Sequence, residues 1–258
     1  MPESSLRPAM FATRALEAKP ANPLIPDAPI AWPLLSAEDC RTTLAAILDL
    51  RARWIQRHHE APFYSLGAVS YLDAEGGPEA RARYEAIAAR ENPVLMAIFG
   101  DLIRRVAASI SEHLGQPVRL TVKQALPGFH VFLSHPGFEQ QVAPIHTDKQ
   151  YELLDWEGGV PEEVFSVTLP IAVPEHGAWM NVWGVHSRDW PMVLPEGWQH
   201  QLIQSPKHHV SYTPGELVFH TGQFVHRIAP SRALGPDDVR VTLQAHGVLL
   251  NGVWELYW

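Results

Sequence analysis

The stretch Ala143-Pro144-Ile145-His146-Thr147-Asp148 is the one around which the rest of this sequence can be organised. Pro144 and the β-branched Ile145 favour an extended backbone leading into His146. In an extended segment, positions two apart share a face, so the His146 imidazole and the Asp148 carboxylate can converge on one metal ion. The pattern by itself is weak evidence, because a chain with 14 His and 28 acidic residues contains such pairs by chance.

A second pair of this kind, His58-x-Glu60, illustrates that risk. Helical spacing of apolar residues predicts a helix that begins near Ser36 and closes at about His58. Positions two apart on a helix point to nearly opposite sides and cannot chelate one ion. Local structure therefore favours His146 and Asp148 over the earlier pair.

The third ligand is expected from a later segment. Residues 214–219 are typical of a turn followed by a short apolar strand, 220–224 of a loop, and 225–228 of a returning strand. His226 on that strand would complete a set of two neutral imidazoles and one carboxylate, which suits Fe(II) and leaves coordination positions open. His220 is the rival third ligand, and we expect it to end the preceding strand instead.

The C-terminal region offers a group that could hold an acidic co-substrate. Residues 239–250 alternate, with Arg240, Thr242, Gln244 and His246 on one face of the predicted strand. A strand with such a regular polar face either faces water or lines a polar barrel interior. The planar guanidinium of Arg240 and the nearby Thr242 hydroxyl suit a carboxylate bound through charge-assisted hydrogen bonds.

In order and spacing, His146-x-Asp148, His226 and Arg240-x-Thr242 resemble the signature of the Fe(II)- and 2-oxoglutarate-dependent oxygenases, over about residues 116 to 250. The resemblance implies an α+β, mainly β chain with a double-stranded β-helix (jelly-roll, cupin-like) core. It implies iron bound by the two histidines and the aspartate, and 2-oxoglutarate bound by Arg240 and Thr242. It also implies O2 as co-substrate, with hydroxylation accompanied by formation of succinate and CO2. Because Asp148 stands where halogenating relatives carry a small residue, hydroxylation is favoured.

Further candidates come from neighbouring segments. Residues 118–124 and 129–133 alternate as strands, and the resemblance implies that one residue on such an early strand helps to hold 2-oxoglutarate. Several side chains meet this description, and the sequence does not decide among Lys123, Gln124 and His130. Substrate contacts are expected on the segment leaving the metal site, on a later strand and in an aromatic loop, from Lys149, Tyr151, Trp183 and Arg188.

The length of 258 residues predicts a single domain with three regions: a Pro-rich extended arm over 1–33, a helical support region over 34–115, and the jelly-roll core over 116–258. Within the support region we expect one helix over about 78–90. A second helix is expected to start at Asn92-Pro93 and to end at Gly115, since proline favours the first helical turn.

Composition limits the classes of binding partner and the cellular location that we expect. With 20 basic and 28 acidic residues the formal charge is -8, and no basic cluster is present, which argues against nucleic acid or an anionic membrane surface. The single cysteine, Cys40, and the absence of a secretory pattern or a long apolar run predict a cytoplasmic protein.

These observations favour an oxygenase acting on a small metabolite, such as an amino acid derivative or a natural-product intermediate. A protein or peptide hydroxylase of the same family is an alternative. A cupin-like metalloenzyme that uses no 2-oxoglutarate is another. The nine Trp also allow a noncatalytic jelly-roll binding module. The sequence leaves the oligomeric state open.

Overall fold

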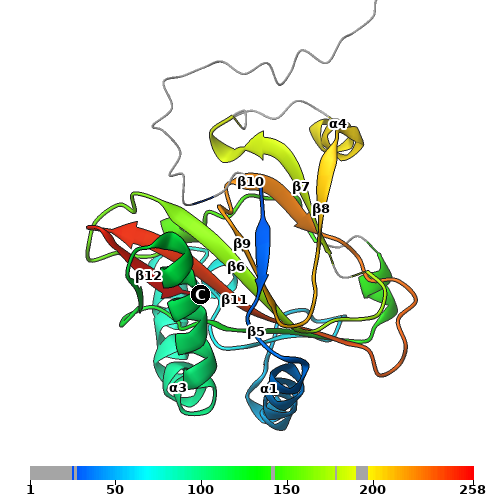
Figure 1. Cartoon of the computed structure of the whole chain (residues 1–258), viewed down its shortest axis with the longest axis horizontal. Coiled ribbons are helices and arrows are strands. Elements are labelled where there is room, and N and C mark those ends of the chain that lie inside the picture. Colours follow the sequence, from blue (N-terminus) through cyan, green and yellow to red (C-terminus); the bar gives the residue numbers. More distant parts are fainter. Residues whose placement is uncertain (1–24, 26–27, 141–142, 178, 190–196) are drawn as a thin grey trace, which may run out of the picture.

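Two sheets form the body of the chain in the computed structural model, which describes residues 25, 28–140, 143–177, 179–189 and 197–258. The main sheet has nine strands in the order β1-β9-β6-β11-β5-β3-β2, with β12 paired to β11 and β4 paired to β12 (Figure 1). Its strands are β1 (Ile30–Pro33), β2 (Ile55–Gln56), β3 (Phe63–Leu66), β4 (Val118–Leu120), β5 (Gly128–Leu133), β6 (Val164–Ala172), β9 (Glu216–His220), β11 (Val239–Leu250) and β12 (Val253–Tyr257). The second sheet has the order β10-β7-β8, with β7 (Trp179–His186), β8 (Lys207–Ser211) and β10 (Phe224–Ile228).

Strand β11 is the centre of the main sheet. It pairs along most of its length with β6, while its first half pairs with β5 and its second half with β12. Its alternation separates two environments, as the sequence predicts: Val241, Leu243 and Ala245 are fully buried in the core between sheet and helices. The opposite face carries the polar residues and is turned toward the second sheet. The mainly β fold predicted from the sequence is confirmed.

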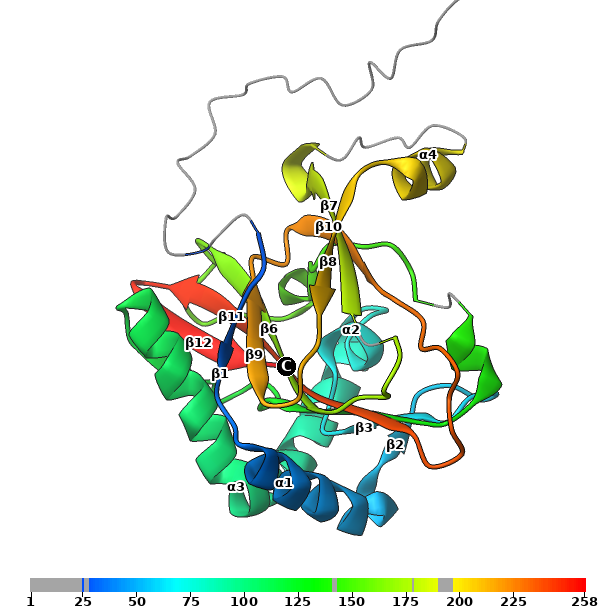
Figure 2. The same ribbon diagram turned by 45° about the vertical axis from the view of Figure 1, so that its right-hand side comes forward.

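Helices α1 and α3 cover the outer face of the main sheet, whereas α4 packs against the second sheet. Figure 2 shows α1 and α3 on the side of that sheet away from β7, β8 and β10. The helices are α1 (Ala37–Asp49), α2 (Ser70–Asp73), α3 (Pro78–Leu114) and α4 (Trp198–Gln204), with short 3-10 turns η2 (Arg51–Arg53), η3 (Pro136–Glu139), η4 (Gln150–Leu153) and η5 (Ser187–Asp189). None of the helices in the described ranges is long and apolar enough to cross a membrane.

Helix α3 is continuous, so the prediction of two helices separated before Pro93 is wrong. It begins at Pro78, whose ring suits the first helical position, and ends at Gly115 in a left-handed conformation. Pro93 lies inside the helix and its side chain is exposed. Proline in a helix interior costs about 3 kcal/mol. Apolar residues buried on both sides of it, including Tyr84 and Leu95, offset that cost.

The first helix is shorter than its apolar periodicity predicts. Ser36 and Asp39 form a capping box at its start, but it ends at Asp49 rather than at His58. Ile55 and Gln56 instead pair with β3, because strand pairing there satisfies their backbone groups within the main sheet. His58 lies in the following loop, and its Nδ1 accepts hydrogen bonds from Glu60 N and Ala61 N. The pair His58-x-Glu60 thus has a local structural role.

Two other predicted segments also differ. The strand expected over 118–124 stops at Leu120, so Gln124 lies in the loop before β5. Most of the expected arm lies outside the described residues, but Ile30–Pro33 forms the edge strand β1 against β9. Trp32 anchors this strand on α3, since its Nε1 donates to Ser109 Oγ at 2.8 Å. The region 34–115 contains α1, α2 and α3 and also supplies β2 and β3 to the main sheet.

Candidate metal centre

The backbone holds the two candidate histidines together. His146 and His226 form an isolated antiparallel bridge, in which His146 N donates to His226 O at 3.1 Å and His226 N donates to His146 O at 2.8 Å. Asp148 N donates to Gly222 O at 2.7 Å, which adds a third backbone hydrogen bond between the two segments. The segment before Asp148 is therefore extended, as its sequence predicts, and it lies beside β10.

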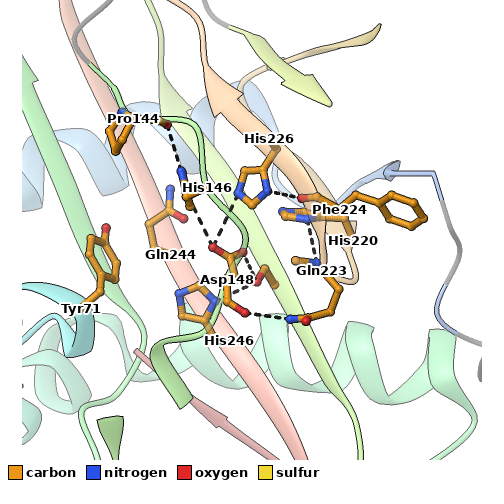
Figure 3. Close-up of polar contacts among 12 residues, drawn as sticks. Tyr71, Pro144, His146, Asp148, His220, Gln223, Phe224, His226, Gln244 and His246 are labelled. Carbon is orange, nitrogen blue, oxygen red and sulfur yellow. Dashed lines mark hydrogen bonds and ion pairs between the residues drawn. The ribbon is translucent and has the colours of Figure 1, made fainter. Parts of the chain in front are cut away.

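Three ligand atoms converge between the sheets (Figure 3). Asp148 Oδ1 lies 3.7 Å from His146 Nε2 and 3.6 Å from His226 Nε2, and the ligand atoms of the three residues all lie within 4.8 Å of one another. Within the described part of the chain, no other group of His, Cys, Asp or Glu converges in this way. One ion can contact all three side chains.

Both imidazoles are oriented for metal binding. His146 Nδ1 lies 3.1 Å from Pro144 O, and His226 Nδ1 lies 2.8 Å from Phe224 O. A carbonyl oxygen only accepts hydrogen bonds, so each Nδ1 carries the proton and each Nε2 presents its lone pair toward Asp148. Burial lowers the pKa of His226, although Asp148 opposes that effect. The neutral ring that a metal requires is thereby favoured.

Asp148 is held at both its side chain and its backbone. Ser166 Oγ donates to Asp148 Oδ2 at 2.6 Å, and Gln223 Nε2 donates to Asp148 O at 2.7 Å. Burial alone would raise the pKa of this carboxyl group, but His226, His246 and His146 carry positive charge at the low pH where a carboxyl titrates, and they bring its pKa below the usual range. At neutral pH Asp148 is therefore ionised. The donor set is therefore two neutral imidazoles and one carboxylate, which fits a divalent transition metal.

His220, the rival ligand, has a different role. Its Nδ1 accepts a hydrogen bond from Gly222 N at 3.1 Å, and burial lowers the pKa of His220 to about 3. Its ring stacks edge-on against His226 at 5.3 Å between centroids, and it is not one of the three converging residues. His220 thus stabilises the turn that brings Gly222 under Asp148.

Arg240 lies on the inward face of β11 with much of its guanidinium unpaired. The residue is 6% exposed, and neither Nε nor Nη2 has a hydrogen-bond partner among the residues that the structure describes. Its Cζ lies 5.3 Å from the Tyr212 ring and 5.9 Å from the Phe132 ring. Burial lowers the pKa of Arg240, while Tyr212 acts in the opposite direction. An unpaired buried cation is costly, so this position indicates a binding place for an anion.

A cavity of about 90 Å³ lies against Arg240, and apolar side chains such as Phe132, Phe138 and Ile228 form much of its wall. None of the three converging ligand residues lines it. Among the described residues that line this cavity, Arg240 is the only basic one. The Asp238 carboxylate also lines the cavity, and its Oδ2 accepts a hydrogen bond from Gly235 N at 2.7 Å. An anion entering here would meet mostly apolar walls, with the Arg240 guanidinium as its cationic partner.

Two of the predicted co-substrate residues lie beside Arg240 and one does not. Thr242 pairs directly with His130 across β11 and β5, so both share the inward face with Arg240. Burial lowers the pKa of His130 to about 3, and its Nε2 lies 3.0 Å from the Tyr71 hydroxyl. Gln124 is elsewhere: its Nε2 donates to Asp155 O at 3.0 Å, in a loop beyond the end of β4.

The four predicted substrate residues are not brought together. Lys149 is exposed next to Asp148, and Tyr151 packs in η4 against the cluster around Tyr257. Arg188 is exposed in η5. Trp183 is fully buried.

The position of Trp183 follows from strand alternation. Val182 pairs with His226 across β7 and β10, so the adjacent Trp183 points to the opposite, outer face of the second sheet. There its ring meets Lys207 and Arg227, whose charged ends lie 5.8 and 5.6 Å from the ring centroid. A substrate contact by Trp183 is therefore not supported.

Sequence reasoning missed several residues that hold the site. Ser166 and His246 lie on the inward faces of β6 and β11, so the polar alternation of those strands was the available signal. Tyr71 gave no signal in the sequence, because its position depends on tertiary contacts. The buried ion pair between Arg57 and Asp73, at 2.6 Å, helps to fix α2, and the Tyr71 hydroxyl then lies beside His130.

Comparisons with known proteins bear on the fold. No model of a known protein family matches the sequence, and no curated protein matches it either. Two similar solved structures are of an N-substituted L-amino acid dioxygenase from Burkholderia ambifaria AMMD, one of them in complex with alpha-KG. The complex is 13% identical, covers 89% of this chain and 86% of its own, and has a TM-score of 0.57; the other has the same identity and coverage and a TM-score of 0.58.

At that identity the likeness shows the fold. The chain has the double-stranded β-helix architecture found in 2-oxoglutarate-dependent dioxygenases, as the sequence predicts.

Proposed function

We propose that the chain is a non-haem Fe(II)- and 2-oxoglutarate-dependent dioxygenase that hydroxylates a C–H bond of a small molecule. The observation that carries the proposal is the unpaired, buried guanidinium of Arg240 in the same interior as the converging His146, Asp148 and His226. A metal site alone is compatible with many reactions. An oxoacid co-substrate requires a cationic group near the metal to bind its second carboxylate, and Arg240 meets this requirement.

The three converging side chains hold the metal in this proposal, through two Nε2 atoms and one carboxylate oxygen. When bound, Fe(II) supplies activation of O2, with 2-oxoglutarate converted to succinate and CO2 and one oxygen atom inserted into a substrate C–H bond. The hydrogen bonds from His146 and His226 to carbonyl oxygens keep the ligand atoms aimed inward before any ion arrives.

Arg240 and Thr242 bind the far carboxylate of 2-oxoglutarate, and the apolar walls beside Arg240 exclude water from that contact. Low local dielectric strengthens the charge-assisted hydrogen bonds. Gln244 orients the Thr242 hydroxyl, since its Nε2 donates to Thr242 Oγ1 at 2.9 Å. His130, held by Tyr71, forms the neighbouring wall. Gln124 has no part in this proposal.

The substrate is a small metabolite of the amino acid derivative type. The likeness in fold to an N-substituted L-amino acid dioxygenase supports that class. The formal charge of -8 and the lack of a basic cluster disfavour nucleic acid as a partner. The proposal includes a cytoplasmic location, because the one cysteine, Cys40, is free and buried.

The alternatives account less well for Arg240. A cupin-like metalloenzyme without an oxoacid, or a noncatalytic binding module, would leave a buried guanidinium with no anion to bind. A peptide hydroxylase would share the metal and co-substrate sites and differ only in its primary substrate.

The test is an anaerobic titration of the apo-protein with Fe(II) and then with 2-oxoglutarate, followed by visible absorption. We expect a weak charge-transfer band that needs both additions and is lost in Arg240→Ala. Arg232→Ala is the matched control, because Arg232 is exposed and stacks on Trp179 at 5.3 Å. Iron binding with no response to 2-oxoglutarate in the unmodified protein would overturn the proposal.

A further inference from the structure

A short hydrogen-bonded chain lies behind the candidate metal ligand Asp148. Ser166 on β6 pairs in register with His246 on β11, so the two side chains share one face of the main sheet. Figure 3 shows the His246 ring beside the Asp148 carboxylate. Ser166 Oγ lies 2.6 Å from Asp148 Oδ2 and 2.9 Å from His246 Nδ1. Ser166 is 4% exposed and His246 is 7% exposed, so little water reaches this chain to replace its hydrogen bonds.

The direction of these hydrogen bonds follows from counting protons. A metal-binding carboxylate only accepts, and a serine hydroxyl has one proton to donate. Ser166 therefore donates to Asp148 Oδ2 and accepts from His246 Nδ1–H. The chain runs from the imidazole through the hydroxyl to the carboxylate, and every donor in it has an acceptor.

The hydrogen bond from Ser166 gives the two carboxylate oxygens of Asp148 different roles. Oδ2 is occupied by Ser166, whereas Oδ1 faces the two imidazole Nε2 atoms at 3.7 and 3.6 Å. Gly222 makes this arrangement possible, since a Cβ there would lie 2.6 Å from Ser166 Oγ and 2.8 Å from Asp148 Oδ2. A carboxylate free to rotate could place both oxygens on one ion and occupy a position that the oxoacid or O2 needs.

We propose that Ser166 and His246 are positioning residues that present Asp148 to the metal through Oδ1 alone. The inference rests on the proposed function to the extent that it assumes a metal held by His146, Asp148 and His226. Neither positioning residue is among the converging ligand atoms. Their effect is exerted through the orientation of the carboxylate, as partners of metal ligands commonly act.

The test measures Fe(II) affinity by anaerobic calorimetry, before any co-substrate is added. Loss of a hydrogen-bond partner of a metal ligand typically costs 10- to 100-fold in affinity, and we expect a loss of about that size for Ser166→Ala. His246→Leu is expected to weaken Fe(II) binding as well. His246→Asn, which keeps an N–H near the position of Nδ1, is expected to restore most of the affinity.

Thr168→Val is the matched control for Fe(II) affinity. Thr168 is the next inward hydroxyl along β6, and its Oγ1 donates to Gln244 Oε1 at 3.0 Å rather than to Asp148. Thermal unfolding of each apo variant checks that it is folded. If Ser166→Ala does not fold, the comparison of His246→Leu with His246→Asn decides, because a packing role for His246 would not be rescued by the smaller amide.

A second readout is the charge-transfer band that Fe(II) and 2-oxoglutarate give together. A carboxylate that occupies two positions competes with the oxoacid, so the band should require more 2-oxoglutarate in Ser166→Ala than in the unmodified protein. Folded Ser166→Ala and His246→Leu with unchanged Fe(II) affinity would overturn this inference and leave the proposed function intact. Failure of the unmodified protein to bind Fe(II) would overturn both.

Discussion

His146 and His226 exchange both hydrogen bonds of an antiparallel backbone bridge, at 3.1 and 2.8 Å between the nitrogen and oxygen atoms. Two ligands that are far apart in the sequence are thus joined by main-chain contacts, which do not depend on either imidazole. A side-chain substitution at one histidine should therefore remove a ligand while the other stays in place. Because the backbone contacts are independent of the side chains, single substitutions can test each ligand in turn.

His226→Ala is expected to abolish stable Fe(II) binding, whereas His220→Ala is expected to retain it. His226 Nε2 faces Asp148 Oδ1 at 3.6 Å, while His220 Nδ1 is used by Gly222 N. Iron retained after anaerobic loading and desalting provides the measurement. Iron retained by the His226 variant and lost from the His220 variant would reverse the assignment.

Arg240→Ala should separate co-substrate binding from stability. Hydrogen bonds to charged groups contribute about 1.5–3 kcal/mol, so the affinity for 2-oxoglutarate should fall by roughly 10- to 150-fold. The apo variant should lose little stability, because removal of a buried charge whose Nε and Nη2 have no hydrogen bond in the described part of the chain offsets the lost contacts with the Tyr212 and Phe132 rings. Thermal unfolding with Fe(II), with and without 2-oxoglutarate, measures both quantities. If 2-oxoglutarate stabilised the unmodified protein and Arg240→Ala equally, Arg240 would not bind the co-substrate.

Gly222→Ala is expected to disrupt the metal centre. Its φ of +70° is in the left-handed region, and an added Cβ would meet Ser166 Oγ at 2.6 Å. We expect a loss of about 1–3 kcal/mol in the free energy of unfolding, together with weaker Fe(II) binding. Gly184→Ala is the control, since its Cβ would meet nothing within 4 Å and it has no positive φ. Urea unfolding and calorimetry with Fe(II) measure the two effects, and equal behaviour of the two variants would argue against the close approach.

Asp73→Ala should destabilise the fold by about 3–5 kcal/mol, because it leaves Arg57 buried without its carboxylate partner. Arg57 Nη1 lies 2.6 Å from Asp73 Oδ1, and the side chains are 7% and 6% exposed. Asp101→Ala, which removes the fully exposed partner of Arg104, should change the free energy of unfolding little. Chemical denaturation compares the two variants. Similar losses in the free energy of unfolding would show that the buried pair contributes no more to stability than the exposed one.

Pro93→Ala should stabilise the protein by up to about 3 kcal/mol, since it restores a helical N–H within α3. The ring of Pro93 is exposed, so little packing is lost. Pro78→Ala, at the start of the same helix, should give no such gain because the N–H there is unsatisfied in any case. A lower thermal midpoint for Pro93→Ala would mean that the ring has a packing role.

The sequence by itself predicted the strands of the core and the three converging side chains, and its resemblance to the oxygenase family implied the jelly-roll arrangement of those strands. Residue alternation with period two is a local property, and it places Arg240, Thr242 and His246 on one face of β11 whichever strands lie beside it. The extended segment at Asp148 and the returning strand at His226 were likewise decided by local turn and strand signals.

Only the tertiary structure decided the rest. Pairing with β3 ended the first helix early, and packing on both sides of Pro93 kept α3 continuous. Strand register turned Trp183 away from the centre, and the Ser166 hydroxyl reached Asp148 because β6 passes beneath that residue. These outcomes depend on which distant segments become neighbours. The free energy that decides them comes from long-range strand pairing and burial, and the local propensities of the residues do not predict it.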